Sequence, residues 1–402
     1  MNIVIAGGGI AGPALGVALA KAGLGSTILE ARPEGAAGGA FLNLAPNGIN
    51  ALAAIGLGDV VERAGGVPLT GIRFRNAAGR EVGHLDGRDE VARFGARNHL
   101  VRRDRLHQVL EDAARAAGVE VRRGAEVASI EDHGDGVRVG LADGTTVDAD
   151  VLLGADGVHS AVRRLAFPDA PRPAYTGILN AGAWTPIDLP DTPEQQLVFG
   201  RRAFFGYVVH RGVAYWFSNV ARRDDPTAGD RSAVDPSTWL PHIRELHAED
   251  PEPVPAILAA ATDVAGVWPV YDVAGLPTWR RGRIGLLGDA AHATSPNAGQ
   301  GASLALEDAV VLAACLRDVP DPAAALRAFE SLRKDRAEKI VELSRRLGRS
   351  KVPSRLGAWF RDRTLPFFLR AGAAETVEKY GYRVDFDAPV AGAPVAAGGA
   401  CR

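Results

Sequence analysis

The sequence predicts an α/β fold in which a mostly parallel sheet, covered by helices, is interrupted by a largely antiparallel sheet. Apolar runs on either side of a helical pattern predict an opening strand–helix–strand unit at 2–6, 10–23 and 26–30. Glycine-rich turns follow apolar strands again at 154–157 and 288–301. Between about 171 and 279, aromatic residues alternate with small or polar ones, which is typical of antiparallel strands.

The remaining elements follow from periodicity and turn residues. Apolar residues at helical spacing predict helices at 45–64, 104–117, 237–262, 301–318 and 322–349. Short apolar or alternating runs predict strands at 71–76, 80–85, 119–123, 125–130, 136–141, 145–148 and 150–154. The first two of these strands flank NAAG and form a hairpin.

Composition excludes several classes of protein. The chain has 402 residues and a net charge of −2, so its average charge gives no case for binding nucleic acid or an acidic membrane surface. Cys315 and Cys401 have no metal-ligand spacing, so neither a metal site nor a disulfide framework is expected. The sequence has no membrane span and no basic signal-peptide region, so we expect a cytoplasmic protein.

The first glycine-rich turn has the pattern of a dinucleotide-binding site. Gly7 suits a tight turn, Gly9 allows a pyrophosphate to approach the backbone, and Gly12 allows the helix to pack closely on the strand. Glu30 ends the second strand, where an acid binds a ribose hydroxyl and disfavours a 2′-phosphate. A NAD-like or FAD-like nucleotide is therefore predicted.

Two further turns place a carboxylate between a buried strand and a helix. Asp156, in GADGVHSAVR, suits either a nucleotide site or an ordinary Asx-type turn, and the residues leave both open. Asp289, in GLLGDAAHATSPNAGQG, can accept hydrogen bonds from a polyol, while the glycines leave N–H groups free for negative charge. We interpret His292 in this stretch as an ordinary polar loop residue.

Taken in this order, the three turns resemble the motifs of the class A FAD-dependent monooxygenases, of the para-hydroxybenzoate hydroxylase and salicylate hydroxylase type. That family's DGxxSxxR matches Asp156, Gly157, Ser160 and Arg163, and its GDAAHxxxPxxGQG matches residues 288–301. Further matches are Arg103, Leu106 and Leu110, and Leu-Glu-Asp-Ala at 306–309. A segment with spaced matching residues also fits the family: Gly38, Gly39, Leu44, Asn47, Leu52, Gly56 and Leu57. The resemblance extends over about residues 1–350.

The resemblance implies a Rossmann-like FAD-binding domain with an inserted, largely antiparallel β-sheet substrate domain and C-terminal helices. The expected parts are an FAD-binding domain at 1–70, 97–170 and 280–350, a substrate domain at 71–96 and 171–279, a helical segment at 351–387 and a disordered tail at 388–402. The residues expected to contact FAD are Gly7, Gly9, Ile10, Ala11, Gly12, Glu30, Ala31, Arg32, Arg103, Asp156, Gly288, Asp289, Pro296, Gly299, Gln300, Gly301 and Ala302. Among them, Asp289 should bind the ribityl chain, and the backbone at 299–302 should face the flavin N1–C2=O edge, which is anionic when reduced.

The resemblance also implies a reaction. NADPH or NADH would reduce FAD, O2 would give a flavin C4a-hydroperoxide, and an aromatic or polycyclic small molecule would take one oxygen atom, as in tailoring steps of secondary metabolism. Epoxidation, Baeyer–Villiger insertion, and a reductase or dehydrogenase without oxygen transfer stay open as alternatives. Many relatives carry an Arg shortly after the glycines that match Gly38 and Gly39, and its absence here leaves the choice of nicotinamide donor open. The oligomeric state is also left open.

The predicted antiparallel sheet offers candidates for a base that would deprotonate a phenol. Tyr207, His210 and Tyr215 have suitable side chains and lie in or beside predicted strands. Ordinary packing in a sheet accounts for these residues better than catalysis does, so they are retained only as candidates.

Overall fold

A six-stranded sheet forms the centre of one half of the molecule. The computed structural model describes residues 1–33, 40–226, 234–273, 275–348, 355–371 and 373–390. The sheet has the order β18 (Arg280–Arg281), β19 (Ile284–Leu286), β12 (Val151–Gly154), β1 (Ile3–Ala6), β2 (Ser26–Glu30) and β8 (Glu120–Arg123). Only the short edge strand β18 is antiparallel to its neighbour. The predicted α/β fold is confirmed by this sheet and its helices.

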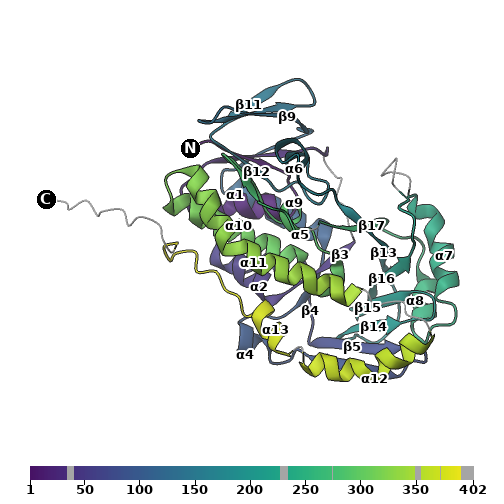
Figure 1. Cartoon of the computed structure of the whole chain (residues 1–402). Coiled ribbons are helices and arrows are strands. Elements are labelled where there is room, and N and C mark those ends of the chain that lie inside the picture. The colour runs from purple at the N-terminus through teal and green to yellow at the C-terminus, as the bar shows by residue number, and fades with distance from the viewer. Residues whose placement is uncertain (34–39, 227–233, 274, 349–354, 372, 391–402) are drawn as a thin grey trace.

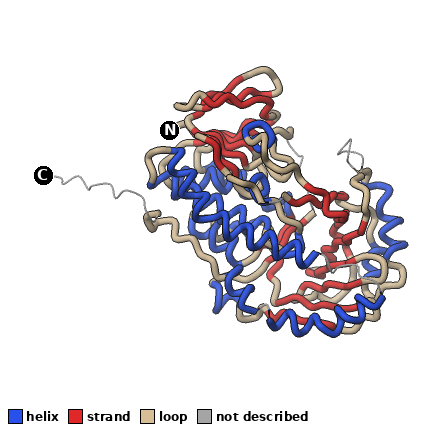
Figure 2. Tube along the Cα trace, in the orientation of Figure 1, coloured by secondary structure: helices blue, strands red, loops and turns tan. Residues whose placement is uncertain are grey.

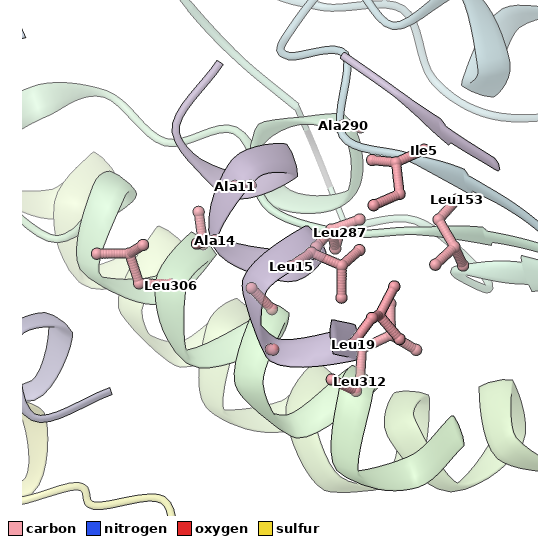
Figure 3. Close-up of a cluster of buried hydrophobic side chains, with 14 of the residues drawn as sticks. Ile5, Ala11, Ala14, Leu15, Leu19, Leu153, Leu287, Ala290, Leu306 and Leu312 are labelled. Carbon is pink, nitrogen blue, oxygen red and sulfur yellow. The ribbon is translucent and has the colours of Figure 1, made fainter. Parts of the chain in front are cut away.

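Helices cover this sheet and bury its central strands completely. The covering helices are α1 (Ala11–Lys21), α5 (Arg103–Ala116), α10 (Gly301–Asp318) and α11 (Pro322–Gly348). Figure 3 shows Leu15 and Leu19 of α1 packed close to Leu312 of α10, with Ile5 of β1 and Leu153 of β12 nearby. All four residues of β1 are buried, as expected for a central parallel strand, and this packing holds the glycine-rich turn after β1 in place.

Two small sheets accompany the central one. The first consists of β9 (Val127–Asp132), β10 (Val137–Leu141) and β11 (Thr146–Ala149). The second, which the sequence did not predict, consists of β3 (Phe41–Leu44), β7 (His99–Arg102) and β4 (Val67–Pro68). Runs such as FLNL and HLVR are too short to show a period. These strands pair although they lie far apart in the chain, so no local sequence pattern predicts the sheet.

A seven-stranded, largely antiparallel sheet forms the other half. Its order is β17 (Gly266–Asp272), β13 (Ala174–Pro186), β16 (Val213–Ala221), β15 (Phe204–His210), β14 (Gln195–Phe199), β5 (Gly71–Asn76) and β6 (Glu81–Asp86). The hairpin β5–β6 joins the later strands through a parallel pairing of β5 with β14. Strands β5 and β6 therefore share one sheet with β13 to β17, although the proposed domain boundaries stay a prediction.

Helices cover the outer side of this sheet. The segment 237–262, predicted as helical throughout, contains two helices, α7 (Trp239–Leu246) and α8 (Val254–Ala260), after a short turn η1 (Pro236–Thr238). Pro251 and Pro253 lie between them and lack the N–H group that a continuous helix needs.

The C-terminal part returns to the edge of the seven-stranded sheet. Helix α12 (Arg355–Ala371) lies against β6, and α13 (Ala373–Tyr380) follows it (Figures 1 and 2). Residues 388–390, predicted to be disordered, are held by α10: the Val390 N–H donates to Asp318 and Arg317 donates to the Ala388 carbonyl. The rest of the predicted tail, 391–402, lies outside the described residues. Within the described ranges, we find no helix with the length and apolar content needed to cross a membrane.

Candidate active site

A cavity of about 1620 Å³ borders both large sheets. Ligand pockets for one small molecule have roughly 300–1,000 Å³, so this cavity has room for a dinucleotide and a second molecule. It brings together fifteen of the seventeen residues predicted to contact the cofactor. The two exceptions, Gly12 and Gly288, lie in the packed backbone behind its wall.

The three glycines of the first turn have distinct geometries. Gly7 has a φ of +108°, and a Cβ there would lie 2.4 Å from the Ala155 carbonyl oxygen. A Cβ on Gly12 would lie 2.0 Å from the Gly7 oxygen, whereas a Cβ on Gly9 would meet nothing within 4 Å. Helix α1 has no side-chain cap at its start. The turn therefore offers uncapped N–H groups and open space beside Gly9, which suits a phosphate.

Glu30 connects the end of β2 to the glycine-rich turn. Its Oε2 accepts a hydrogen bond from the Gly8 N–H at 2.7 Å, and its Oε1 accepts one from the Arg32 N–H at 2.9 Å. A carboxylate offers about four acceptor positions, so capacity remains for a ribose hydroxyl. Glu30 lines the cavity, where it both shapes the turn and is available to a ligand.

Asp289 is a half-buried carboxylate on the cavity wall, at the first position of α9 (Asp289–His292). No hydrogen bond or ion pair joins its side chain to any other described residue. Gly301, at the start of α10, lies close by: a Cβ on this glycine would be 3.8 Å from Asp289 Oδ1. An acceptor without a protein partner, facing a cavity, is what a hydroxylated chain such as ribityl requires.

The start of α10 also faces the cavity without a cap. Its N-cap residue, Gln300, makes no side-chain cap; its Oε1 accepts from Asn47 at 3.0 Å, and its buried Nε2 has no partner among the described residues. Gly299, Gly301 and Ala302 line the cavity here. The 18-residue helix therefore directs the positive end of its dipole at this part of the wall, which suits an anionic ring edge.

Arg103 adds positive charge to the same wall. It is the first residue of α5, and its exposed side chain lines the cavity. The protein around the cavity keeps part of the solvent away from its guanidinium. Burial lowers the pKa of Arg103, the charge of Asp289 opposes that shift, and the charge of Arg32 adds to it. A guanidinium stays protonated in proteins, so Arg103 and Arg32 bring two positive charges to a wall that would hold a pyrophosphate.

The Asp156 motif makes contacts that are mainly structural. Asp156 accepts from the Ser160 hydroxyl and from the Val162 N–H at 3.1 Å, and Ser160 caps α6 (Ala161–Ala166). Arg163 donates to the carbonyl of Ala290 at 2.7 Å and so joins α6 to α9. Burial raises the pKa of Asp156 despite these bonds. The turn interpretation explains each contact, while Asp156 still borders the cavity.

His292 is buried rather than an ordinary polar loop residue, so that interpretation was wrong. It is 3% exposed, and its Nε2 lies 2.5 Å from Asp308 Oδ2. Asp308 Oδ1 accepts from Arg333 at 2.8 Å, and the same guanidinium lies 2.6 Å from Glu307. Asp308 also accepts from the Gly288 N–H at 3.0 Å. The buried network ties α9, α10 and α11 together behind Asp289.

Replacing His292 with glutamine should destabilise the protein by about 2 kcal/mol near pH 6, because Asp308 loses a charged partner but keeps Arg333. Burial lowers the pKa of His292, but the charge of Asp308 outweighs it and raises that pKa above its usual 6.5. The contribution of His292 is therefore complete below pH 6.5 and is lost as the pH rises through the folded-state pKa.

The check is the melting temperature, followed by circular dichroism, of both proteins between about pH 6 and 9. The wild type should lose stability with rising pH, and His292→Gln should show a smaller slope. Burial raises the pKa of Asp308, but His292 and Arg333 outweigh it and hold that pKa well below 3.8, so the Asp308 contribution is constant across this range. Parallel pH profiles for the two proteins would contradict the assignment.

The seven-stranded sheet presents aromatic side chains on both faces. Residues that line the cavity include Phe74, Phe199, Phe204, Phe217 and Trp268. The opposite face packs beneath α7 and α8, and its buried aromatics are Phe205, Tyr207 and Trp216. The sheet thus separates an apolar cavity wall from a structural core.

None of the three candidate bases lines the cavity. Tyr207 belongs to the core beneath α7 and α8, and burial raises its pKa, which disfavours the phenolate. His210 lies at the end of β15, with its Nδ1 3.4 Å from Asp191 Oδ2. Tyr215 packs against a small cluster with Val67 and other apolar residues. A catalytic role for these residues stays a prediction.

Sequence reasoning missed several residues of the cavity wall. Asn43 on β3 donates to Gln195 on β14 at 2.8 Å, and both line the cavity. Helix α12 contributes Phe360 and Phe368 to the same wall. Residue type alone could not reveal them, since these segments are far apart in sequence and come together only in the folded chain.

The fold and the cavity define a dinucleotide-dependent enzyme whose cofactor site faces a sheet that can hold a substrate. The chain belongs to the family with the FAD binding domain, whose model matches residues 1–344. It is 33% identical over 358 residues to the FAD-dependent urate hydroxylase of Klebsiella pneumoniae, covering 86% of this chain and 89% of that protein. It is 32% identical over 375 residues to the aurachin C monooxygenase/isomerase of Stigmatella aurantiaca, covering 91% and 94%.

Solved structures agree with this family. Klebsiella pneumoniae HpxO complexed with FAD and uric acid matches with a TM-score of 0.80 at 30% identity, covering 94% of each chain. The resemblance to class A monooxygenases is confirmed, and the protein is an FAD-dependent monooxygenase. The open space at Gly9, the free Asp289 carboxylate and the uncapped start of α10 fit FAD.

Proposed function

We propose that the protein uses NADPH or NADH together with O2 to hydroxylate a small aromatic or polycyclic molecule. One observation carries this proposal: two different walls border one cavity of about 1620 Å³. The first wall, here called the cofactor wall, is formed by the glycine-rich turns, and the second, here called the substrate wall, is apolar and rich in phenylalanine. Relatives named for monooxygenation of aurachin C and of 3-amino-4-hydroxybenzoate, and for hydroxylation of urate, support the substrate class.

The residues of the cofactor wall would hold FAD in a defined order. Gly7, Gly9 and Glu30 would bind the ADP part, Asp289 the ribityl chain, and the start of α10 the flavin edge that becomes anionic on reduction. When bound, FAD supplies electron transfer and oxygen activation. The helix dipole would stabilise the developing negative charge without having to reorganise.

The substrate wall would orient the substrate and exclude water. Phe204 and Phe217 provide apolar surface for a planar ring, and their ring centroids lie 6.1 Å apart. The amides of Asn180 and Gln195 also line the cavity and can bind polar ring substituents by hydrogen bonding. An apolar wall of this kind keeps water away from the place where oxygen would be transferred. Hydroxylation requires this exclusion, because water promotes side reactions.

The deciding experiment is incorporation of ¹⁸O from ¹⁸O2, measured by mass spectrometry. The FAD-loaded enzyme is given NADPH or NADH and a panel of phenols, fused-ring aromatics and urate. We expect at least one compound to accelerate flavin reduction and to gain one labelled oxygen atom. Product structure distinguishes a hydroxyl group from an epoxide or an ester. Rapid oxidation of the nicotinamide without label in any product would instead favour a reductase or dehydrogenase.

A further inference from the structure

Helix α12 carries aromatic side chains that are unusually exposed. Trp359, Phe360, Phe367 and Phe368 have exposed fractions of 59%, 61%, 70% and 61%, the highest among the large hydrophobic residues of the described chain. Figure 1 shows α12 along one edge of the molecule, below β5. Clustered aromatic exposure of this kind marks a surface that another molecule covers.

The inner side of α12 is already anchored to the sheet. Leu365 and Leu369 lie close to Gly83 of β6, and the Arg361 guanidinium lies 4.0 Å from the centre of the Phe199 ring. Asn76 donates to Asp362 at 2.9 Å. Because these contacts fix the orientation of α12, no other part of the described fold covers its exposed aromatic residues.

Residues spaced by four define the side of α12 that points away from the sheet. Trp359, Arg363 and Phe367 occupy successive turns on one face, and the Arg363 guanidinium lies 4.9 Å from the centre of the Trp359 ring. These three residues do not line the cavity, whereas Phe360, Thr364 and Phe368 on the neighbouring face do. We call Trp359, Arg363 and Phe367 the outer face of α12.

The outer face lies within a basic part of the chain. Residues 349–383 contain eight Lys or Arg and three Asp or Glu, a net charge of +5, so the rest of the chain carries −7. The near-neutral average therefore conceals a strong local asymmetry. An acidic membrane surface can attract this segment, although the net charge of the whole chain is −2.

We propose that α12 docks the protein on an anionic lipid bilayer. Trp359 and Phe367 would enter the headgroup region while Arg363 and neighbouring basic residues bind lipid phosphates. Aromatic residues combined with Arg on one helix face, without enough length or apolar content to span, characterise interfacial helices. A second copy of the chain fits less well, because a symmetric contact through α12 would bring two segments of +5 together.

Docking would also place the cavity near the lipid. Phe360 and Phe368 are both exposed and line the cavity, so the surface assigned to lipid is continuous with the cavity wall. If the proposed function holds, an apolar substrate dissolved in the bilayer would have a short path to the active site. Docking itself is independent of that function and is tested without turnover.

The test is co-sedimentation of the full-length, FAD-loaded protein with lipid vesicles. One set contains about 30 mol % phosphatidylglycerol in phosphatidylcholine, and the other contains phosphatidylcholine alone. We expect at least tenfold tighter binding to the anionic vesicles and weaker binding as salt rises above about 0.1 M. Arg363→Glu should weaken binding at least fivefold, the equivalent of about 1 kcal/mol for one basic residue near the surface.

The double variant Trp359→Ser/Phe367→Ser should lose at least tenfold in vesicle binding. The matched control is Leu332→Ser, an exposed apolar residue of α11 outside the basic segment, which should bind as the wild type does. An unchanged flavin spectrum and melting temperature would show that each variant is folded.

Three results would overturn the proposal. The first is failure of the wild type to sediment with anionic vesicles at low salt. The second is wild-type binding by the double variant. The third, from light scattering, is a wild-type dimer that the double substitution dissociates while neither protein binds vesicles, because α12 would then join two copies of the chain.

Discussion

Asp289→Ala is expected to purify largely without FAD. The Asp289 carboxylate lines the cavity and has no partner among the described residues, so the hydrogen bonds assigned to it are those with the ribityl chain. Hydrogen bonds to a charged group contribute about 1.5–3 kcal/mol, which corresponds to a loss of about tenfold to a hundredfold in FAD affinity. The variant should fold, since no described contact of the side chain is removed.

Flavin occupancy is measured from the ratio of flavin to protein absorbance, and affinity by titrating FAD into the apoprotein. Asp188→Ala, which removes an exposed carboxylate outside the cavity, is the matched control and should retain the cofactor. Asp289→Asn should lie between the two, because an amide oxygen can still accept a hydrogen bond. Full occupancy with wild-type affinity in Asp289→Ala would refute the role assigned to Asp289.

Gly12→Ala and Gly9→Ala should affect different properties: the first should impair folding, and the second should impair FAD binding. A Cβ on Gly12 would lie 2.0 Å from the Gly7 carbonyl oxygen, a backbone atom that cannot move aside, so we expect about 3 kcal/mol or more of destabilisation. A Cβ on Gly9 meets no protein atom within 4 Å, so the apoprotein should keep its stability. It would, however, occupy the space assigned to the pyrophosphate and weaken FAD binding.

The two glycine variants act as controls for each other. The melting temperature of each apoprotein reports on folding, and titration with FAD reports on the site. We expect a large fall in melting temperature only for Gly12→Ala, and a loss of FAD affinity without a stability change for Gly9→Ala. Wild-type affinity in Gly9→Ala would mean that the pyrophosphate does not lie against this glycine.

Much of the cofactor wall could be read from the sequence, because its chemistry is local. A strand, a glycine-rich turn and a helix are contiguous in the chain, and the positions of the glycines indicate the backbone geometry. Gly7 has a positive φ, and Gly12 has no room for a side chain. Parallel strands also end at one edge of a sheet, so turns after β1, β12 and β19 had to meet.

The substrate wall could not be read in this way. Alternation along β15 shows that Phe204 and Tyr207 lie on opposite faces, but both faces are apolar, so the pattern cannot say which one borders the cavity. His292 looked like a loop residue because its partners, Asp308 and Arg333, lie on two later helices.

The sequence by itself determined the class of protein, the cofactor and the backbone geometry of its site, since each depends on neighbours within a few turns of chain. Only the tertiary structure decided which face of the seven-stranded sheet lines the cavity, that His292 is part of a buried ion network, and that α12 borders the cavity. These outcomes depend on pairings such as that of Asn76 with Asp362, 286 residues apart, and a contact over that distance is selected by the packing of the whole chain.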